Sequence, residues 1–252
     1  MKAHQRIMRE KIQKEEQEYS LLGKYWEQID IDISKAEVKK IDLGVAKKII
    51  EKYEWLKCLS AINKYQFGIF FDNVCAGVVV YGTDYAENLG HWDKYGFTGK
   101  ILLLNRGACV HWAHPHSASK LISQSMKMLP KKYEVITATV DDLAGEIGTI
   151  YQACNFYYIG SMRDANPKIN SKKGDRCGWL INNKLYGSRA IRSKFGTTKI
   201  EIIKQAHPDV KKVKQNSKGR YFYFRGTKTQ NKKHLKSISH LIKTYPKRNY
   251  IK

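Results

Sequence analysis

The stretch that decides the fold is residues 100–140, KILLLNRGACVHWAHPHSASKLISQSMKMLPKKYEVITATV. Residues 100–112 are rich in apolar residues and predict a strand. From Ser117 to Leu129 apolar residues recur at helical spacing, which predicts an amphipathic helix. Residues 133–140 are β-branched and predict a second strand. Strand, helix and strand in this order indicate a sheet covered by helices.

The flanking segments extend the same architecture. Residues 65–82, YQFGIFFDNVCAGVVVYG, predict a hairpin that turns at Asp72-Asn73. Residues 43–56 predict an amphipathic helix before it. Residues 148–160, GTIYQACNFYYIG, predict a helix followed by a short strand. Residues 1–28 are rich in Lys, Glu, Gln and Arg and indicate a helical N-terminal extension, which leaves residues 29–165 as the core domain.

Charge is concentrated at the end of the chain. The sequence has 46 Lys and Arg against 23 Asp and Glu, a net charge of +23. Residues 1–150 hold 21 basic and 19 acidic residues, whereas residues 151–252 hold 25 basic and 4 acidic ones. This asymmetry indicates a polyanion partner, most often nucleic acid, although a solvated basic surface is an open alternative. We predict a basic α/β-hairpin module over residues 166–252, with its hairpin turning at Lys218-Gly219.

Composition also excludes several classes. No apolar run approaches the roughly 18–20 residues that a membrane-spanning helix needs, and the N-terminal residues lack the apolar segment of a secretory signal. The five cysteines are scattered and never spaced C-x-x-C. This spacing argues against a disulfide framework and against a zinc ribbon. We therefore expect a protein of a reducing cytoplasm.

The helix that begins at Ser117 offers an anion site. Its first turn holds Ser117, Ala118 and Ser119, followed by Lys120. Unpaired backbone N–H groups and the helix dipole suit a pyrophosphate there, and the small residues allow close approach. The alternative is that Ser117 only caps the helix.

The segment GTIYQACNFYYIG resembles the L-Y-x-x-x-G-F segment of GCN5-related N-acetyltransferases (the GNAT fold). In that family the tyrosine lies beside the thiol of acyl-CoA and can act as general acid, a place that Tyr151 takes here. Asn155 and Phe156 stand where Gly-Phe is usual. The resemblance implies a GNAT-like mixed, mainly antiparallel sheet flanked by helices, with acetyl-CoA as cofactor. Alternatively, Tyr151 is an ordinary core residue.

Residues 40 to 165 resemble the Mom proteins of phage Mu and its relatives, GNAT-like enzymes that add a carbamoylmethyl group to N6 of DNA adenine and so shield phage DNA from restriction. The matching pieces are IIEKYEWL, FGIFFDNVCAGVVVYG, Asn105-Arg106-Gly107 and TVDDLAGEIGTIYQACNFYYIG. This resemblance implies that Asp141, Tyr151 and Arg106 are site residues, and that the chain acts on double-stranded DNA in the cytoplasm of a bacterial host. A helix N-cap for Asp141 and a structural salt bridge for Arg106 are the alternatives.

Two departures from these families stand out. Glu54-Trp55 replaces the His-Tyr of relatives, which puts any metal or proton role of that histidine in doubt. HPHSASK stands where GNAT enzymes carry the Arg/Gln-x-x-Gly-x-Gly/Ala loop that binds acyl-CoA.

The segment Cys109–His116 is rich in metal-ligand residue types. Three histidines, His111, His114 and His116, fall within six residues of one another and could hold a transition metal such as iron. Their spacing fits no structural zinc motif. Contact of these loop histidines with a phosphate or base is the alternative.

Aromatic and basic residues are the candidates for DNA contact. A target adenine has to leave the base stack before its N6 can enter a pocket, and aromatic rings can hold it there. Lysines and arginines along a hairpin can follow the phosphates. The candidates are Trp55, Tyr85, Trp92, Trp112, Lys211, Lys212, Lys214, Lys218, Arg220 and Arg225.

Three functions are thus compatible with the sequence. The first is a Mom-type enzyme that modifies DNA adenine using acyl-CoA. The second is an N-acetyltransferase acting on a protein or a small amine, against which the basic end of the chain argues. The third is a DNA-binding protein with a degenerate GNAT core and no catalytic activity. The sequence leaves the oligomeric state open.

Overall fold

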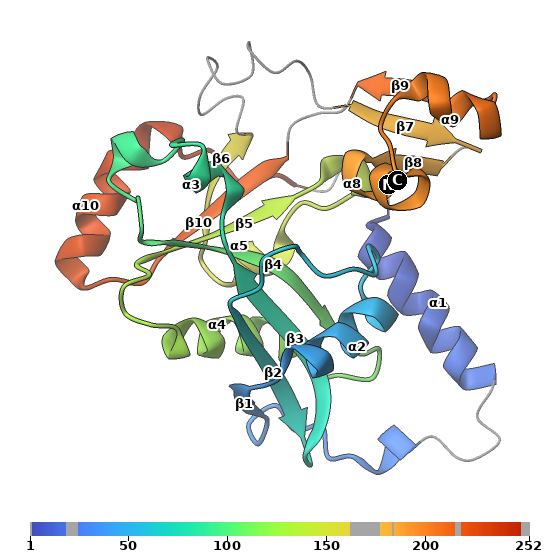
Figure 1. The fold of residues 1–252 in the computed structure, drawn as a ribbon. Helices are drawn as coiled ribbons and strands as arrows, with labels where there is room; N and C mark the ends of the chain where they lie inside the picture. The colour runs from blue at the N-terminus through green and yellow to red at the C-terminus, as the bar shows by residue number, and fades with distance from the viewer. Residues whose placement is uncertain (1, 19–24, 162–176, 183, 215–217, 248–252) are drawn as a thin grey trace. The chain divides into compact units, whose positions relative to one another are not determined.

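The computed structural model describes residues 2–18, 25–161, 177–182, 184–214 and 218–247, and its main feature is a seven-stranded sheet (Figure 1). The strand order is β1-β2-β3-β4-β5-β10-β6. The strands are β1 (Glu37–Lys40), β2 (Tyr65–Phe71), β3 (Val74–Gly82), β4 (Ile101–Cys109), β5 (Val135–Val140), β6 (Tyr157–Ser161) and β10 (Gly219–Phe224). β1 to β4 pair antiparallel in succession, as β5 and β10 do, whereas β4 and β5 are parallel.

The parallel pair β4–β5 is joined by α4 (Ser117–Met128), the crossover helix that a parallel connection requires. Only residues 101–104 of β4 pair with β5, opposite residues 135–138. Beyond Leu104, β4 continues along β3, while the end of β5 pairs with β10. The two parallel strands therefore separate toward their C-terminal ends, and this opening positions the candidate site.

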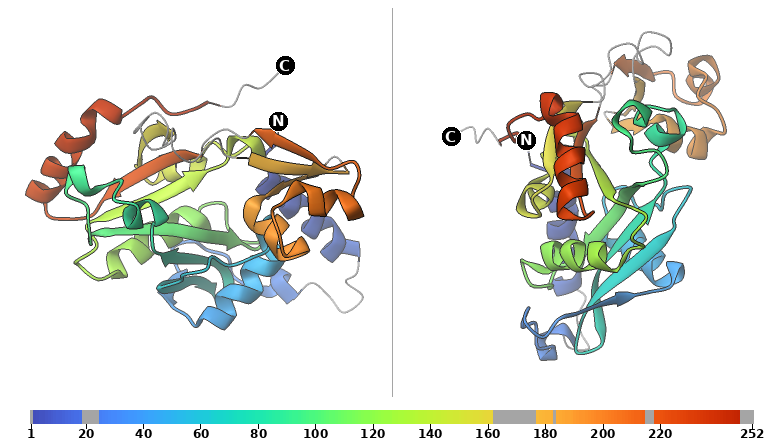
Figure 2. Two further views of the ribbon diagram at one scale, coloured as in Figure 1. Left: turned by 45° about the horizontal axis from the view of Figure 1, so that its top comes forward. Right: turned by 90° about the vertical axis from the view of Figure 1, so that its left-hand side faces the viewer.

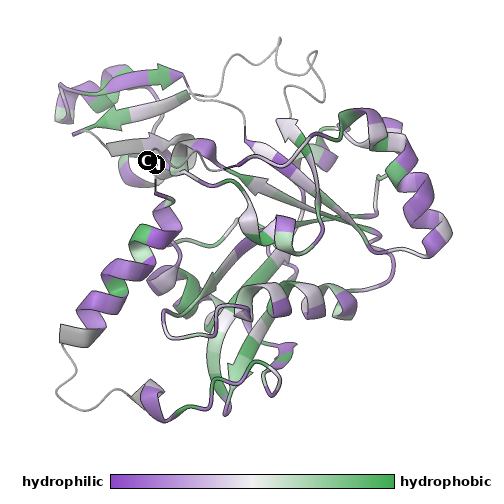
Figure 3. Ribbon diagram, turned by 180° about the vertical axis from the view of Figure 1, so that it is seen from behind, coloured by the Kyte–Doolittle hydropathy of each residue, from purple (hydrophilic) through white to green (hydrophobic). Residues whose placement is uncertain are grey.

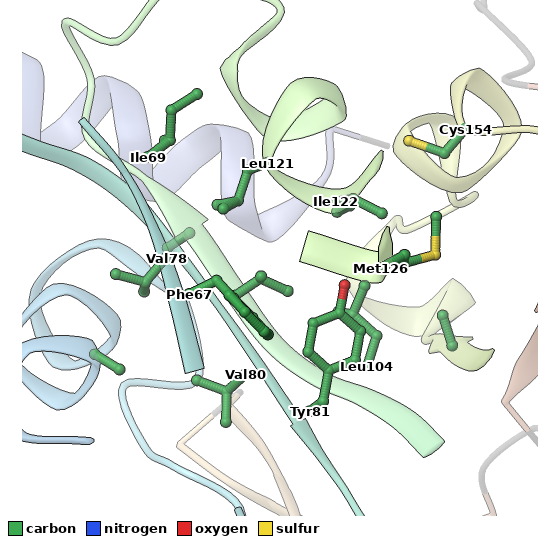
Figure 4. Packing of buried hydrophobic residues seen from close by; sticks show 14 of the residues in the cluster. Phe67, Ile69, Val78, Val80, Tyr81, Leu104, Leu121, Ile122, Met126 and Cys154 are labelled. Atoms are coloured by element: carbon green, nitrogen blue, oxygen red, sulfur yellow. The ribbon is translucent and has the colours of Figure 1, made fainter. Parts of the chain in front are cut away.

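The core lies between this sheet and its helices. α4 and α2 (Leu43–Tyr53) lie on opposite faces of β2, β3 and β4 (Figure 2). Side chains alternate between the faces along each strand, so both faces of β3 are apolar. On the α4 side Tyr81 is fully buried, and its hydroxyl lies 2.8 Å from the Ser125 hydroxyl. Figure 4 shows this ring beside Leu104 and Met126.

The last strand of the sheet corrects one prediction. The hairpin predicted to turn at Lys218-Gly219 is wrong, because β10 pairs with β5 while β9 (Lys211–Lys214) pairs with β7 (Cys177–Ile181) of another sheet. The aromatic residues of β10 explain why this strand lies between β5 and β6 inside the sheet. Alternate residues pack on opposite faces, Tyr221 against Tyr151 and Phe222 against Trp92, and a strand that is apolar on both faces suits the interior of a sheet.

The segment after β10 packs against the residues that connect α4 to β5. Arg225 donates hydrogen bonds to the carbonyl oxygens of Leu129, Pro130 and Tyr133 at 2.6–2.8 Å. α10 (Lys228–Ile238) follows, and its buried His234 lies 2.6 Å from the carboxylate of Glu134. These contacts make the C-terminal residues part of the sheet's own unit.

The remaining helical elements are short or peripheral. They are α1 (His4–Glu18), η1 (Tyr25–Gln28), α3 (Tyr85–Asn88), η2 (Asp93–Tyr95), η3 (Asp142–Ala144), α5 (Thr149–Ala153) and η4 (Ser239–Leu241). In Figure 3 the outer faces of α1 and α10 are largely hydrophilic, whereas the central strands are hydrophobic. This contrast is expected of helices that cover a buried sheet.

The chain divides into two compact units, residues 1–160 with 219–252, and residues 161–218. The second unit contains a sheet of order β8-β7-β9 with β8 (Lys184–Gly187), and the helices α8 (Ser188–Phe195) and α9 (Ile200–Ala206). Its core consists of Trp179, Ile181, Ile191, Ile203 and Val210. Residues 219–252, which we expected in the C-terminal module, therefore belong to the sheet's unit.

The predicted fold class is confirmed for the core, which has a mixed, mainly antiparallel sheet flanked by helices. The C-terminal module is a separate α/β unit over residues 161–218 without the predicted hairpin. In the described part of the chain, none of the helices combines the length and apolar character that crossing a bilayer requires.

Candidate active site

Asp141 stands directly after β5, where the two parallel strands separate. It is 7% exposed and begins a loop that runs to Gly148. Glu146 closes this loop, because its carboxylate accepts a hydrogen bond from the Asp141 backbone N–H at 2.9 Å and its own N–H donates to the Asp141 carbonyl at 3.1 Å. The backbone that carries Asp141 is therefore held by a local ring of hydrogen bonds.

Glu146 also joins this loop to the end of α2. Its second carboxylate oxygen accepts a hydrogen bond from the indole Nε1 of Trp55 at 2.8 Å. Trp55 was predicted as a base-stacking residue, and here its polar edge is committed to Glu146. Glu146 was not among the residues predicted for the site, since a glutamate six residues beyond a strand carries no distinctive signal.

Tyr151 lies in α5, packed between aromatic rings. Its ring centroid is 5.5 Å from that of Phe156 and 5.4 Å from that of Tyr221. Burial raises the pKa of the Tyr151 phenol well above its usual value, and the nearby carboxylates Glu146 and Glu54 raise it further. The phenol therefore keeps its proton at neutral pH and can act as a hydrogen-bond donor.

Arg106 approaches the same region from β4. Its Nε donates to the Cys58 carbonyl at 2.8 Å and lies 4.0 Å from the carboxylate of Glu54. Its Nη1 donates to the Asn105 carbonyl at 2.8 Å. Both side chains are mostly buried, with 16% and 9% exposure. Arg106 lowers the pKa of Tyr151, opposing the carboxylates, so Glu54, Arg106 and Tyr151 form one electrostatic group.

The N-terminal helix α1 lies over these elements. The amide of Gln5 donates to the Tyr53 carbonyl at 2.7 Å and accepts from the Trp55 N–H at 3.1 Å, so it clamps the end of α2. Arg9 donates to the His111 carbonyl at 2.6 Å. Ala3 lies so close to Gly145 that a β-carbon there would come within 3.1 Å of its backbone. The predicted N-terminal extension thus supports the loops of the candidate site.

The three candidate metal histidines are not brought together. His111 is 8% exposed, and its Nδ1 lies 3.1 Å from the Glu16 carboxylate. His114 and His116 have ring centroids 5.3 Å apart, and the His114 Nδ1 accepts a hydrogen bond from the His116 N–H. Among the residues that the structure describes, no group of three His, Cys, Asp or Glu side chains is placed to hold a metal ion.

The first turn of α4 contains one buried hydroxyl group that makes no hydrogen bond in the described structure. This hydroxyl belongs to Ser117. Ser119 donates to the His116 carbonyl and Lys120 to the Ile33 carbonyl, at 2.9 and 2.6 Å, while Ala118 is partly exposed. Ser117 is not an N-cap here, because the helix begins with it.

Asn155, which stands where the GNAT segment has glycine, is the remaining candidate for cofactor contact, and it lies two residues beyond the end of α5. It is exposed and adopts a left-handed backbone with φ of 60°, which asparagine tolerates better than most residues. Its neighbour Cys154 lies 3.8 Å from the Ser119 carbonyl, so α5 and α4 are adjacent.

Four DNA-contact candidates lie on exposed or partly exposed parts of the chain. Tyr85 is 68% exposed. Lys211, Lys212 and Lys214 are exposed along β9 in the second unit.

The other candidates are held more tightly. Lys218 and Trp112 are partly buried, and the indole N–H of Trp112 is buried. Trp92 is 1% exposed, and the Arg220 guanidinium stacks over its ring at 5.3 Å while pairing with Asp84. Arg225 is committed to carbonyl oxygens. These last three residues serve the fold, so we no longer place DNA contacts on them.

The Mom protein family matches residues 35–247. This chain belongs to the Mom family. The match begins after α1, and it includes Glu54, Arg106, Asp141, Glu146 and Tyr151. Membership supports a DNA-modification enzyme of the group-transfer class. No curated protein matches the chain.

Solved structures with a partial likeness include two acetyltransferases and an N-acyl amino acid synthase. FeeM, an N-acyl amino acid synthase from uncultured soil microbes, is 16% identical with a TM-score of 0.38, over 50% of this chain and 81% of that one. The IAA acetyltransferase from Bacillus cereus is 8% identical with a TM-score of 0.38, over 75% and 99%. The spermidine N-acetyltransferase from Vibrio cholerae, solved with CoA and spermine, is 9% identical with a TM-score of 0.38, over 80% and 99%.

Proposed function

We propose that this protein transfers an acyl-derived group from acyl-CoA to N6 of adenine in double-stranded DNA. The observation that supports the proposal is that Arg106 lies on β4 beyond its last pair with β5 and Asp141 directly follows β5, while Arg106 acts electrostatically on Tyr151. In phage-borne members of such a family this chemistry shields DNA from restriction enzymes, and we extend that role to this chain.

The opening between the strands fits an extended ligand. Beyond Leu104 one edge of β4 pairs with β3. The other edge, which faces β5, makes no further strand pairs in the described part of the chain. Backbone N–H and C=O groups on such an edge can bond to the amide groups of a pantetheine chain. The unpartnered hydroxyl of Ser117 and the first turn of α4 suit its pyrophosphate. The bound thioester would supply an activated carbonyl carbon.

Asp141 and Tyr151 then have complementary roles. Adenine N6 is a weak nucleophile because its lone pair is delocalised into the ring. In acetyl transfer, as the bond between N6 and the carbonyl carbon forms, Asp141 accepts the N6 proton, and as the C–S bond breaks, Tyr151 gives its proton to the departing sulfur. A carbamoylmethyl product requires in addition an amide nitrogen donor and a further step. The Tyr151 phenol holds its proton at neutral pH, as the second role requires, while the burial that raises its pKa also makes it a weaker acid.

The basic second unit supports DNA as the substrate. The lysines of β9 are exposed on an edge strand, and edge lysines are well placed to contact phosphates. Such contacts position a duplex and carry no sequence information by themselves. A partly exposed aromatic such as Trp112, or the exposed Tyr85, is our candidate for holding the flipped base.

The test is nucleoside mass spectrometry of DNA from cells that produce the protein, beside an empty vector. We expect a new adenine species, heavier by an acetyl or carbamoylmethyl group. Asp141→Asn and Tyr151→Phe should remove it, whereas Asp142→Asn, an exposed neighbour on the same loop, should retain it. Unmodified DNA from cells with abundant folded protein contradicts the proposal. Acetyl transfer to a peptide or polyamine without DNA would then favour an amine acetyltransferase, and DNA binding alone would favour a binding protein.

A further inference from the structure

A cavity of about 420 Å³ lies at the end of β10, where the strand passes into α10. Its lining includes Tyr157, Tyr223, Phe224, Lys228, Asn231 and Lys232. Asn155, one of the candidates for cofactor contact, also lines the cavity, whereas Asp141, Arg106 and Tyr151 are not among its lining residues. The cavity volume falls within the range of small-ligand pockets.

The cavity and Asp141 lie at opposite ends of one strand pair. Phe224 pairs with Val135, and Gly219 pairs with Val140, the residue before Asp141. Since a strand rises about 3.3 Å per residue, six residues separate the two places by roughly 20 Å. The cavity is therefore separate from Asp141. Tyr151 lies nearer to it, because its ring packs on Tyr221, two residues before the lining residue Tyr223.

The walls of the cavity combine three kinds of group. Aromatic rings come from β6 and β10, where Tyr157 and Phe224 have centroids 5.9 Å apart. The side-chain oxygen of Asn231 is buried and has no hydrogen-bond partner in the described structure. Lys228 and Lys232 lie one helical turn apart on α10, and both are exposed. No acidic residue is among the described residues that line the cavity.

These groups match the parts of a nucleotide. Every nucleobase has a face that stacks on aromatic rings, and ammonium groups attract its phosphate. A buried carboxamide oxygen without a partner costs free energy until a donor reaches it, and an exocyclic amine is such a donor. We propose that this cavity binds one unstacked nucleotide of a DNA strand. The proposal rests on the proposed function only in taking DNA as the polyanion.

The sequence around the cavity favours a DNA strand over a free nucleotide. Residues 219–252 contain ten Lys and Arg and no Asp or Glu. Lys233 and Lys236 extend the basic character of α10 beyond the cavity. A run of positive charge suits a chain of phosphates better than a single one. The competing source of the same chemistry is the nucleotide half of acyl-CoA, which the experiment separates.

The first experiment is photocrosslinking with a duplex that carries one bulged 5-iododeoxyuridine, followed by peptide mass spectrometry. We expect the crosslink on Tyr157 or Tyr223, because iodouracil reacts with an aromatic ring on which it stacks. Excess adenosine 3′,5′-bisphosphate, the nucleotide part of CoA, should leave the crosslink in place. Crosslinks confined to other peptides overturn the proposal, and removal of the crosslink by the bisphosphate assigns the cavity to acyl-CoA instead.

The second experiment compares two double variants of one helix with equal change in charge. Lys228→Gln with Lys232→Gln removes the cavity's cations, while Lys233→Gln with Lys236→Gln removes two outside it. If both cavity lysines contact phosphate, the slope of log Kobs against log salt falls by about 1.8 in the first variant. The control should change it by less than half as much. An equal change of this slope in the two double variants would contradict a phosphate site formed by Lys228 and Lys232.

The two proposals fail separately. Nucleoside mass spectrometry on the same cells reports the proposed function, and the crosslink reports the cavity. A crosslink at Tyr157 or Tyr223 with unmodified DNA overturns the proposed function alone. Modified adenine without a crosslink there overturns the cavity alone.

Discussion

Arg220→Met tests whether this arginine serves the fold or DNA. In the structure the Asp84 carboxylate is 1% exposed and accepts hydrogen bonds from Arg220, from the Thr137 hydroxyl at 2.7 Å and from the Ala86 N–H at 3.0 Å. Methionine keeps much of the side-chain volume above Trp92 but leaves the buried carboxylate without its cation. Breaking a buried ion pair on one side costs about 3–5 kcal/mol.

This cost should be visible in thermal unfolding. At about 2–4 °C per kcal/mol for a unit of this size, Tm should fall by about 6–20 °C. Adding Asp84→Asn should recover a large part of the loss, because the uncompensated charge is removed. Calorimetry would report Tm, and filter binding at a temperature where both proteins are folded would report DNA affinity.

The matched comparison is Lys211→Gln with Lys212→Gln, on the exposed strand β9. This variant should lower DNA affinity with Tm unchanged, the reverse of Arg220→Met. If Arg220→Met unfolds within about 1 kcal/mol of the wild type and instead weakens DNA binding, our account of the buried pair is wrong.

Three further predictions concern the loops around Asp141. Gly148→Ala should destabilise the protein by about 2–5 kcal/mol, as measured by urea unfolding. Gly148 has a φ of +72°, which alanine tolerates poorly, and the added carbon would lie 2.5 Å from the Tyr221 ring. A variant as stable as the wild type would contradict this. Burial lowers the pKa of His111 below 6.5, so the unfolded chain binds the proton at a higher pH than the folded protein does. The free energy of unfolding should therefore fall as pH drops below about 6.5. His111→Asn should remove this pH dependence, and an unchanged pH dependence would assign it to other groups. Gln5→Ala should speed amide exchange in residues 53–58 and 141–148, and unaltered exchange there would mean that α1 does not hold these loops.

How much of the fold was predictable follows from the range of the interactions involved. Residues 100–140 specify strand, helix and strand through local periodicity, and the structure has all three. The strand character of Gly219–Phe224 was equally plain. Its partners were not, because strand pairing is set by which surfaces bury each other, and Val140 lies far away in sequence.

The same distinction applies to the candidate site. Asp141, Tyr151 and Arg106 were proposed from a family resemblance, which the match over residues 35–247 supports. Their assignment as site residues stays a prediction. Glu54 was noted only as a departure from the family pattern, and Glu146 was not singled out, since a carboxylate becomes part of a site only when a distant indole or guanidinium is brought to it.

By itself, the sequence determined the mixed architecture, the family and the concentration of positive charge after residue 150, because these depend on local pattern and composition. Only the tertiary structure decided which charges face solvent. It turned Arg220 and Arg225 inward to pair with a carboxylate and with carbonyl oxygens, and it left the β9 lysines exposed. The physical reason is that burial and pairing are properties of contacts between segments far apart in the chain.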